Sequence, residues 1–175
     1  GGLVVQGVGG KPDPVRAIDY FKKGCDGGDG TACAFYGAQL AEGAGVKRDA
    51  KRGLELLERS CEKLGSPQGC AMYSRGLVLG LGGKERVKDG VDIAESLCAQ
   101  GELSSCLMGA GAYLQGRGVE RDDRRGARLL AVACSAGSKA ACRLKKKVPA
   151  KVREEVDAEP APARAPAPSA PPPPS

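Results

Sequence analysis

The side chains with the clearest chemical potential are eight cysteines, which fall into four pairs. Cysteine sulfur can form disulfides, bind metal ions or act in redox catalysis. The members of a pair are eight or nine residues apart, and corresponding cysteines recur every 36 or 37 residues. The pairs are Cys25–Cys33, Cys61–Cys70, Cys98–Cys106 and Cys134–Cys142. Any chemistry assigned to them must therefore suit four similar places in the chain.

The regular pairing favours a disulfide framework in an oxidising compartment. A zinc site typically has CxxC-like spacing and often histidine, and the sequence has neither. A redox catalyst typically has a reactive thiol in a CxxC motif, which is also missing. Reduced, buried cysteines are the alternative to disulfides. We predict four disulfides, no metal and no cofactor.

A disulfide within a pair requires the helix to break between the two cysteines. Eight residues of continuous helix separate two Cα atoms by about 12 Å, whereas a disulfide needs about 4.4 to 6.8 Å. Glycine or proline lies inside every pair, where it can break a helix: Gly27-Gly28, Gly65-Ser66-Pro67, Gly101 and Gly137. Because a period of this length is typical of two-helix repeats, the pattern predicts an all-α solenoid.

Each repeat has a first helix that starts at the second cysteine of a pair. Apolar or small residues three, four and seven positions later mark one helical face. Glycines ten and twelve positions after the cysteine are predicted to end this helix and turn the chain. They are Gly43 and Gly45, Gly80 and Gly82, and Gly116 and Gly118.

The second helix of a repeat is predicted to start at an aspartate N-cap. Asp13, Asp49 and Asp122 each stand twelve residues before a cysteine, whereas the middle repeat has Arg86 there. A small residue four positions further on would let the two helices approach closely. This position holds Ala17, Gly53, Gly90 and Gly126.

Composition limits the classes of function. Aromatic residues make up 3% of the chain, and tryptophan and histidine are absent, so the commonest general base is missing. The net charge of +6 is spread in mixed sign, and only Lys145–Lys147 forms a basic run, so we predict no nucleic-acid partner. No stretch is apolar enough to predict a membrane span.

The turn between the two helices resembles a known family. Gly43-Ala-Gly-Val46 followed by Asp49, and Gly116-Arg-Gly-Val119 followed by Asp122, are similar to the Sel1-like repeat. With the cysteine corners, they resemble its cysteine-rich, secreted Hcp-type members. The resemblance implies a right-handed α/α superhelix of about four two-helix repeats, disulfide-bridged hairpins, and an adaptor or ligand-binding role. The middle repeat departs from the pattern with Gly80-Leu-Gly-Gly83.

The expected domain organisation has three parts. Residues 1–12 are predicted to be a flexible lead-in, residues 13–148 the Sel1-like solenoid, and residues 149–175 a disordered tail rich in proline and alanine. The periplasm or the secreted space is the predicted location. We predict a monomer that binds a protein or peptide.

Stacked repeats create an extended concave surface that can bind such a partner. An apolar row lies two residues after each second cysteine: Phe35, Met72, Met108 and Leu144. This row either faces a ligand or packs between repeats. The predicted ligand-facing residues are Phe35, Gln39, Met72, Arg75, Met108 and Gln115.

The alternative function is binding or weak hydrolysis of β-lactams, or binding of cell-wall peptides. Some cysteine-rich members of the family carry such a label, and Ser60-Cys-Glu-Lys63 matches the Ser-x-x-Lys motif of serine penicillin-interacting enzymes. The accompanying Ser-Asp-Asn and Lys-Thr-Gly motifs are absent. Lys63 at a helix end is expected to interact with the last carbonyls instead. We therefore predict a non-catalytic protein without catalytic residues.

Overall fold

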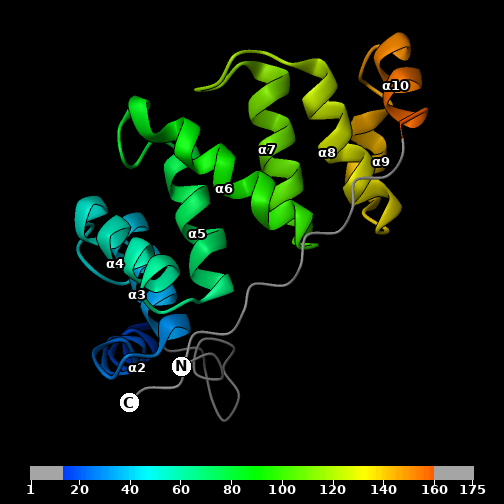
Figure 1. Cartoon of the computed structure of the whole chain (residues 1–175). Coiled ribbons are helices and arrows are strands. Elements are labelled where there is room, and N and C mark those ends of the chain that lie inside the picture. Colours follow the sequence, from blue (N-terminus) through cyan, green and yellow to red (C-terminus); the bar gives the residue numbers. More distant parts are fainter. Residues whose placement is uncertain (1–13, 160–175) are drawn as a thin grey trace. The chain divides into compact units, whose positions relative to one another are not determined.

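The computed structural model describes residues 14–159, which form nine α-helices and one short 3-10 helix, with no strand in this range (Figure 1). The all-α prediction is confirmed. The predicted cap Asp13, the predicted lead-in and the chain from residue 160 onward lie outside the described residues. The helices are α2 (Pro14–Asp26), α3 (Gly30–Glu42), α4 (Ala50–Glu62), α5 (Pro67–Val78), η1 (Lys84–Arg86), α6 (Val87–Ala99), α7 (Leu103–Gln115), α8 (Asp123–Ser135), α9 (Lys139–Lys145) and α10 (Ala150–Asp157).

The described chain divides into two compact units at Tyr73 and Ser74, inside α5. In the N-terminal unit, residues 14–73, α3 packs against both α2 and α4. In the C-terminal unit, residues 74–159, α7 packs against α6 and lies side by side with α8 (Figure 1). The first helices of the repeats are α3, α5, α7 and α9, and the second helices are α2, α4, α6 and α8. None of the helices in the described range is long and apolar enough to cross a membrane.

Two second helices begin at the predicted aspartate caps. The Asp49 carboxylate accepts a hydrogen bond from the Arg52 N–H at 3.0 Å, and Asp122 accepts one from Arg125 at 2.8 Å. In the middle repeat, α6 begins after Arg86, whose side chain does not cap it, and η1 replaces the extended residues before the cap. The middle repeat is therefore the irregular one, as the missing aspartate indicates.

The predicted turn glycines lie in the turns that follow the first helices of all three repeats. In two repeats both φ angles are positive, between 63° and 77°: Gly43, Gly45, Gly116 and Gly118. In the middle repeat the positive angles belong to Gly80, with φ 84°, and to Gly83, with φ 91°, rather than to Gly82. The Gly83 N–H donates to the Gly80 carbonyl at 3.1 Å, which closes a tight turn before η1.

Close contact between the helices of a repeat depends on the predicted small residue. A Cβ atom added to Gly53 would lie 2.6 Å from the Gly37 carbonyl oxygen and 2.7 Å from the Ala41 nitrogen, both in α3. Such distances are far below van der Waals contact, so no larger residue fits without moving the backbone. Gly90 has the same role in the C-terminal unit, where an added Cβ would lie 2.9 Å from the Ser74 carbonyl oxygen, whereas at Gly126 it would first meet the Leu114 side chain at 2.7 Å.

The folded chain continues past the predicted solenoid boundary at 148. Helix α10 packs against α8, and Val148 and Val156 are each only 5% exposed in the same core cluster. Glu159 pairs with Arg124 and Arg128 of α8. The predicted tail therefore begins too early, because Val152 and Val156, four residues apart in α10, give this helix an apolar side that packs into the core cluster.

Candidate functional site

The four corners between successive helices are closed by disulfides. All eight cysteines pair as predicted, with Cα–Cα distances of 4.3, 4.3, 4.6 and 4.8 Å in chain order. No cysteine is free. The structure therefore contradicts the alternative of reduced cysteines.

Each corner turns at a glycine from the set that the sequence identifies. Gly28, Gly65, Gly101 and Gly137 have φ between 60° and 96°, a region that side chains with a Cβ rarely adopt. At all four corners, the N–H of the residue after this glycine donates to a carbonyl of the preceding helix, and at three of them that carbonyl is five residues earlier, as in the Schellman motif. One example is the Glu102 N–H, which donates to the Leu97 carbonyl at 3.0 Å.

The residue four positions before each second cysteine caps the next helix: Asp29, Ser66, Glu102 and Ser138. We call these the corner caps. The Asp29 carboxylate accepts from the Ala32 N–H at 3.0 Å, while the Asp29 N–H bonds to the Gly24 carbonyl at 2.9 Å. One residue thus ends one helix and starts the next. The sequence analysis missed these caps, although an oxygen-bearing side chain at a constant offset from cysteine is a usable signal.

Glu102 is the corner cap with a shifted acidity. Burial alone would raise the pKa of its carboxyl group, but hydrogen bonds from Ser105 and Ser104 outweigh burial and lower the pKa below its ordinary value. The Ser105 N–H donates to Glu102 Oε2 at 2.6 Å, and the Ser104 hydroxyl donates to Oε1 at 2.7 Å. The ionised carboxylate is therefore the form that caps α7.

Two first helices carry little charge. Helix α3 carries one charged side chain, Glu42, and α7 carries none. By contrast, the second helices α4 and α8 carry six and four charged side chains, and the short first helix α9 carries three. Where they are exposed, α3 and α7 therefore offer mainly uncharged groups, whereas α4 and α8 offer mainly charge.

The predicted ligand-facing residues of the N-terminal unit are partly exposed. The Phe35 ring stacks on Phe21 of α2 with ring centroids 5.0 Å apart, so one face of the ring is used in packing between helices. Gln39 is half-buried, and its Oε1 atom is buried without a hydrogen-bond partner in the described chain. Met72 is also half-buried. Whether these residues bind a ligand stays a prediction.

In the C-terminal unit the predicted residues differ more in exposure. Met108 is half-buried and packs against the cluster that contains Val91 and Tyr113. Arg75 and Gln115 are exposed, and Gln115 accepts a hydrogen bond from Arg117 at 2.9 Å. Leu144, the last residue of the apolar row, is 41% exposed. The row therefore serves inter-helix packing at Phe35 and Met108 and leaves surface available at its end.

The Ser-x-x-Lys motif is not arranged as a nucleophile site. Ser60 is fully buried, and its hydroxyl donates a 2.6 Å hydrogen bond to the Gly30 carbonyl. The side chain is so enclosed that a Cβ added to Gly69 would lie 2.0 Å from Ser60 Oγ. Lys63 is exposed and forms the C-terminal cap position of α4, where its N–H bonds to Arg59. Ser60 thus joins helix ends in the core and is out of reach of a β-lactam.

Comparison with known families agrees with this repeat geometry. The sequence model described as Sel1 repeat matches residues 3–29, 30–63 and 104–138, which together are more than half of the chain. The chain belongs to the Sel1-repeat family. The first matched Sel1 repeat starts inside the predicted lead-in, and residues 64–103, the irregular middle repeat, are not matched.

Similar proteins are known by sequence and by structure. Cytochrome c oxidase assembly factor 7 of Xenopus tropicalis is 40% identical over 52 residues, which are 29% of this chain and 22% of that protein. A protective antigen of uropathogenic Escherichia coli with an SLR fold superposes with a TM-score of 0.72 and 24% identity over 83% of this chain and 31% of that one. A Sel1 repeat protein from Oxalobacter formigenes gives a TM-score of 0.65 and 22% identity over 89% and 67%. These structures show the Sel1 fold, and the chain spans less than a third of the first two proteins.

Proposed function

We propose that this Sel1-repeat protein is a non-catalytic scaffold that binds a protein or peptide through the first helices of its repeats, in the periplasm or the secreted space. Sel1 repeats typically serve protein–protein interaction. The frog relative carries the name of an assembly factor, which suits a role in bringing other proteins together. Four disulfides are typical of an oxidising compartment.

The observation that carries this proposal is the weak charge of α3 and α7. Each of these helices has a half-buried aromatic or thioether group, Phe35 in α3 and Met108 in α7, and such groups lose little solvation when a partner covers them. Charged side chains on α4 and α8 would cost more to desolvate. Helices α3 and α7 are therefore the favoured places for a partner to bind.

Gln39 is the half-buried amide of α3. Its Oε1 atom is buried without a hydrogen-bond partner in residues 14–159, and such an acceptor costs about 1 to 3 kcal/mol. Gln39→Leu should therefore leave the free energy of unfolding equal or raise it.

Site-specific photo-crosslinking in cells that express the natural protein tests the proposal. The crosslinker is placed at exposed first-helix positions, Arg75 and Gln115, and at exposed control positions on second helices, Ser96 of α6 and Ser135 of α8. We expect a discrete crosslinked polypeptide from the first-helix positions. Equal crosslinking from the α6 and α8 positions, or none from α5 and α7, would contradict the proposal.

A further inference from the structure

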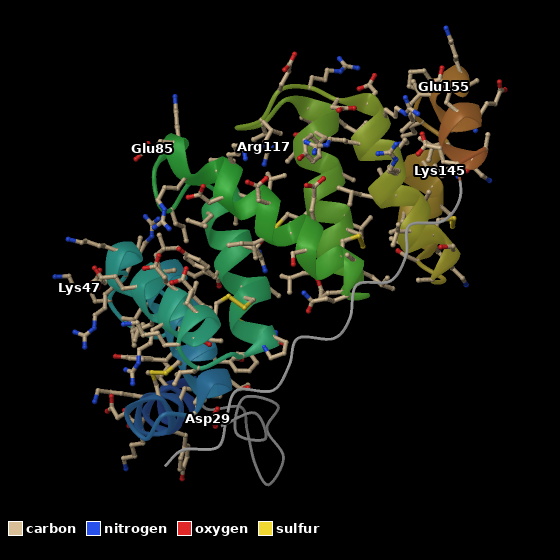
Figure 2. All side chains as sticks on the ribbon, in the orientation of Figure 1. Asp29, Lys47, Glu85, Arg117, Lys145 and Glu155 are labelled. Atoms are coloured by element: carbon tan, nitrogen blue, oxygen red, sulfur yellow. A yellow bond between two sulfur atoms is a disulfide. The ribbon has the colours of Figure 1, made fainter. Side chains whose placement is uncertain are left out.

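The turn that joins α3 to α4 and the first residues of α4 together carry four basic side chains within six residues. Lys47, Arg48, Lys51 and Arg52 are all exposed, and we call them the basic turn. Arg48 is held in place, because its Nε donates a 3.0 Å hydrogen bond to the Ala41 carbonyl at the end of α3. Figure 2 shows Lys47 extending away from both helices.

The corresponding turns of the other repeats contain ion pairs. In the last repeat, Arg121 pairs with Asp123 at 2.9 Å, and Arg124 pairs with Glu159. In the middle repeat, Lys88 pairs with Asp92 at 2.6 Å. The basic charge of these turns is therefore partly neutralised by acidic residues of the chain itself.

The basic turn lacks this neutralisation. None of its four side chains is in an ion pair with another described residue. The carboxylate of Asp49, which lies between them, accepts the Arg52 N–H as the cap of α4. Glu55 lies one helical turn beyond Lys51, but no ion pair joins the two. Like charges at this spacing repel, and a ligand with negative charge relieves that repulsion.

We propose that the basic turn is a docking surface for an acidic segment of a protein, whose aspartate and glutamate carboxylates bind Lys47, Lys51 and Arg52. This surface is distinct from the first-helix surface of the proposed function. Carboxylates suit it because guanidinium and ammonium groups both donate charge-assisted hydrogen bonds to them. No aromatic residue belongs to the turn, so the stacking contacts typical of single-stranded nucleic-acid binding are missing there.

The probe is a fluorescently labelled deca-glutamate peptide, and its binding to the whole chain is followed by anisotropy. The triple variant Lys47→Glu, Lys51→Glu and Arg52→Glu keeps Arg48, which is bonded to α3. Acidic residues near a helix N-terminus are favourable, so this variant should fold. The control variant reverses three exposed charges near α9, Lys139, Arg143 and Lys147, and changes the net charge by the same amount.

We expect the parent chain to bind the peptide at about 50 mM salt, and more weakly at about 200 mM. The triple variant should bind at least about tenfold more weakly, whereas the control variant should stay within about twofold of the parent. Absence of binding to the parent, or an equal loss in both variants, would overturn the proposal. Tighter binding of an oligo-dT strand or of a phosphatidylserine vesicle than of the peptide would also overturn it. The crosslinking positions on α5 and α7 lie outside the basic turn, so the two proposals can fail separately.

Discussion

At the scale of single residues, the corner caps show that the type of side chain matters as well as its place. Asp29, Ser66, Glu102 and Ser138 hold equivalent positions, yet only some of them can ionise. A hydroxyl caps a helix equally at any ordinary pH, whereas a carboxyl group caps best when it is ionised. Equivalent corners should therefore respond differently to acid.

The first prediction concerns Glu102→Gln. The folded-state pKa of Glu102 is lowered, so its contribution to stability is present above the unfolded pKa, about 4.3, and is lost as the pH falls through the folded value. The variant should have a lower free energy of unfolding than the parent at pH 7, and the difference should vanish in strong acid. Urea unfolding across this pH range measures it. Ser138→Ala is the control, because its loss should be the same at every pH.

The second prediction concerns Gly53→Ala. The new methyl group would meet backbone atoms of α3 at 2.6 and 2.7 Å, so the helices of this repeat must separate. We expect a loss of about 1 to 3 kcal/mol in the free energy of unfolding. Gly111→Ala is the control, because no atom lies within 4 Å of its Cβ and alanine favours the helix by up to about 1 kcal/mol. A similar change in both variants would refute the close-packing explanation.

The residues that could be predicted are those that recur without change of type. Cysteines and glycines repeat, so the disulfide pairs and the corner glycines follow from spacing alone. The corner caps were missed because the residue type varies among aspartate, serine and glutamate at the position four residues before each second cysteine. The burial of Ser60 was also beyond the sequence, because it depends on a hydrogen bond to Gly30, thirty residues away in the chain.

At the scale of elements, the four corners share a geometry but differ in exposure. Cys25, Cys33, Cys98 and Cys106 are at most 2% exposed. Both cysteines of the second and the fourth corners are half-buried: Cys61, Cys70, Cys134 and Cys142. Thiol–disulfide exchange requires that a thiolate reach a sulfur atom of the disulfide. The four disulfides are therefore not equally protected from reduction.

The third prediction follows from this difference. Under native conditions with a mild thiol reductant, the Cys61–Cys70 and Cys134–Cys142 bridges should open before the other two. Differential alkylation followed by mass spectrometry identifies which cysteines react first. Simultaneous opening of all four bridges would show that reduction follows global unfolding instead.

Element boundaries were predictable only where a terminal signal is present. Asp49 and Asp122 mark two helix starts correctly, while the middle repeat, with Arg86, has an additional 3-10 turn. Helix α10 was missed because the proline-rich composition after it dominates the segment. The spacing of Val152 and Val156 was the available signal, since it places two valines on one face of the helix.

At the scale of the whole molecule, the family follows from sequence, and the surface used for binding does not. A period of 36 to 37 residues and the turn motifs identify a Sel1-repeat protein. Which side chains remain available, such as Gln39 or Lys47, depends on the partners that neighbouring helices provide. These contacts between helices are known only once the structure is known.

The corner disulfides also determine how far the protein can be stretched. Each bridge joins cysteines eight or nine residues apart, so a force on the chain ends cannot extend the residues between them. Reduction should release about 25 Å of contour length per corner, since an extended residue spans about 3.3 to 3.6 Å and the bridged Cα atoms are already 4.3 to 4.8 Å apart. Single-molecule pulling of oxidised and reduced protein would measure this gain, and equal contour lengths would refute it. In the oxidised protein, a covalent bond at each corner prevents a pulling force from extending the residues between the two cysteines.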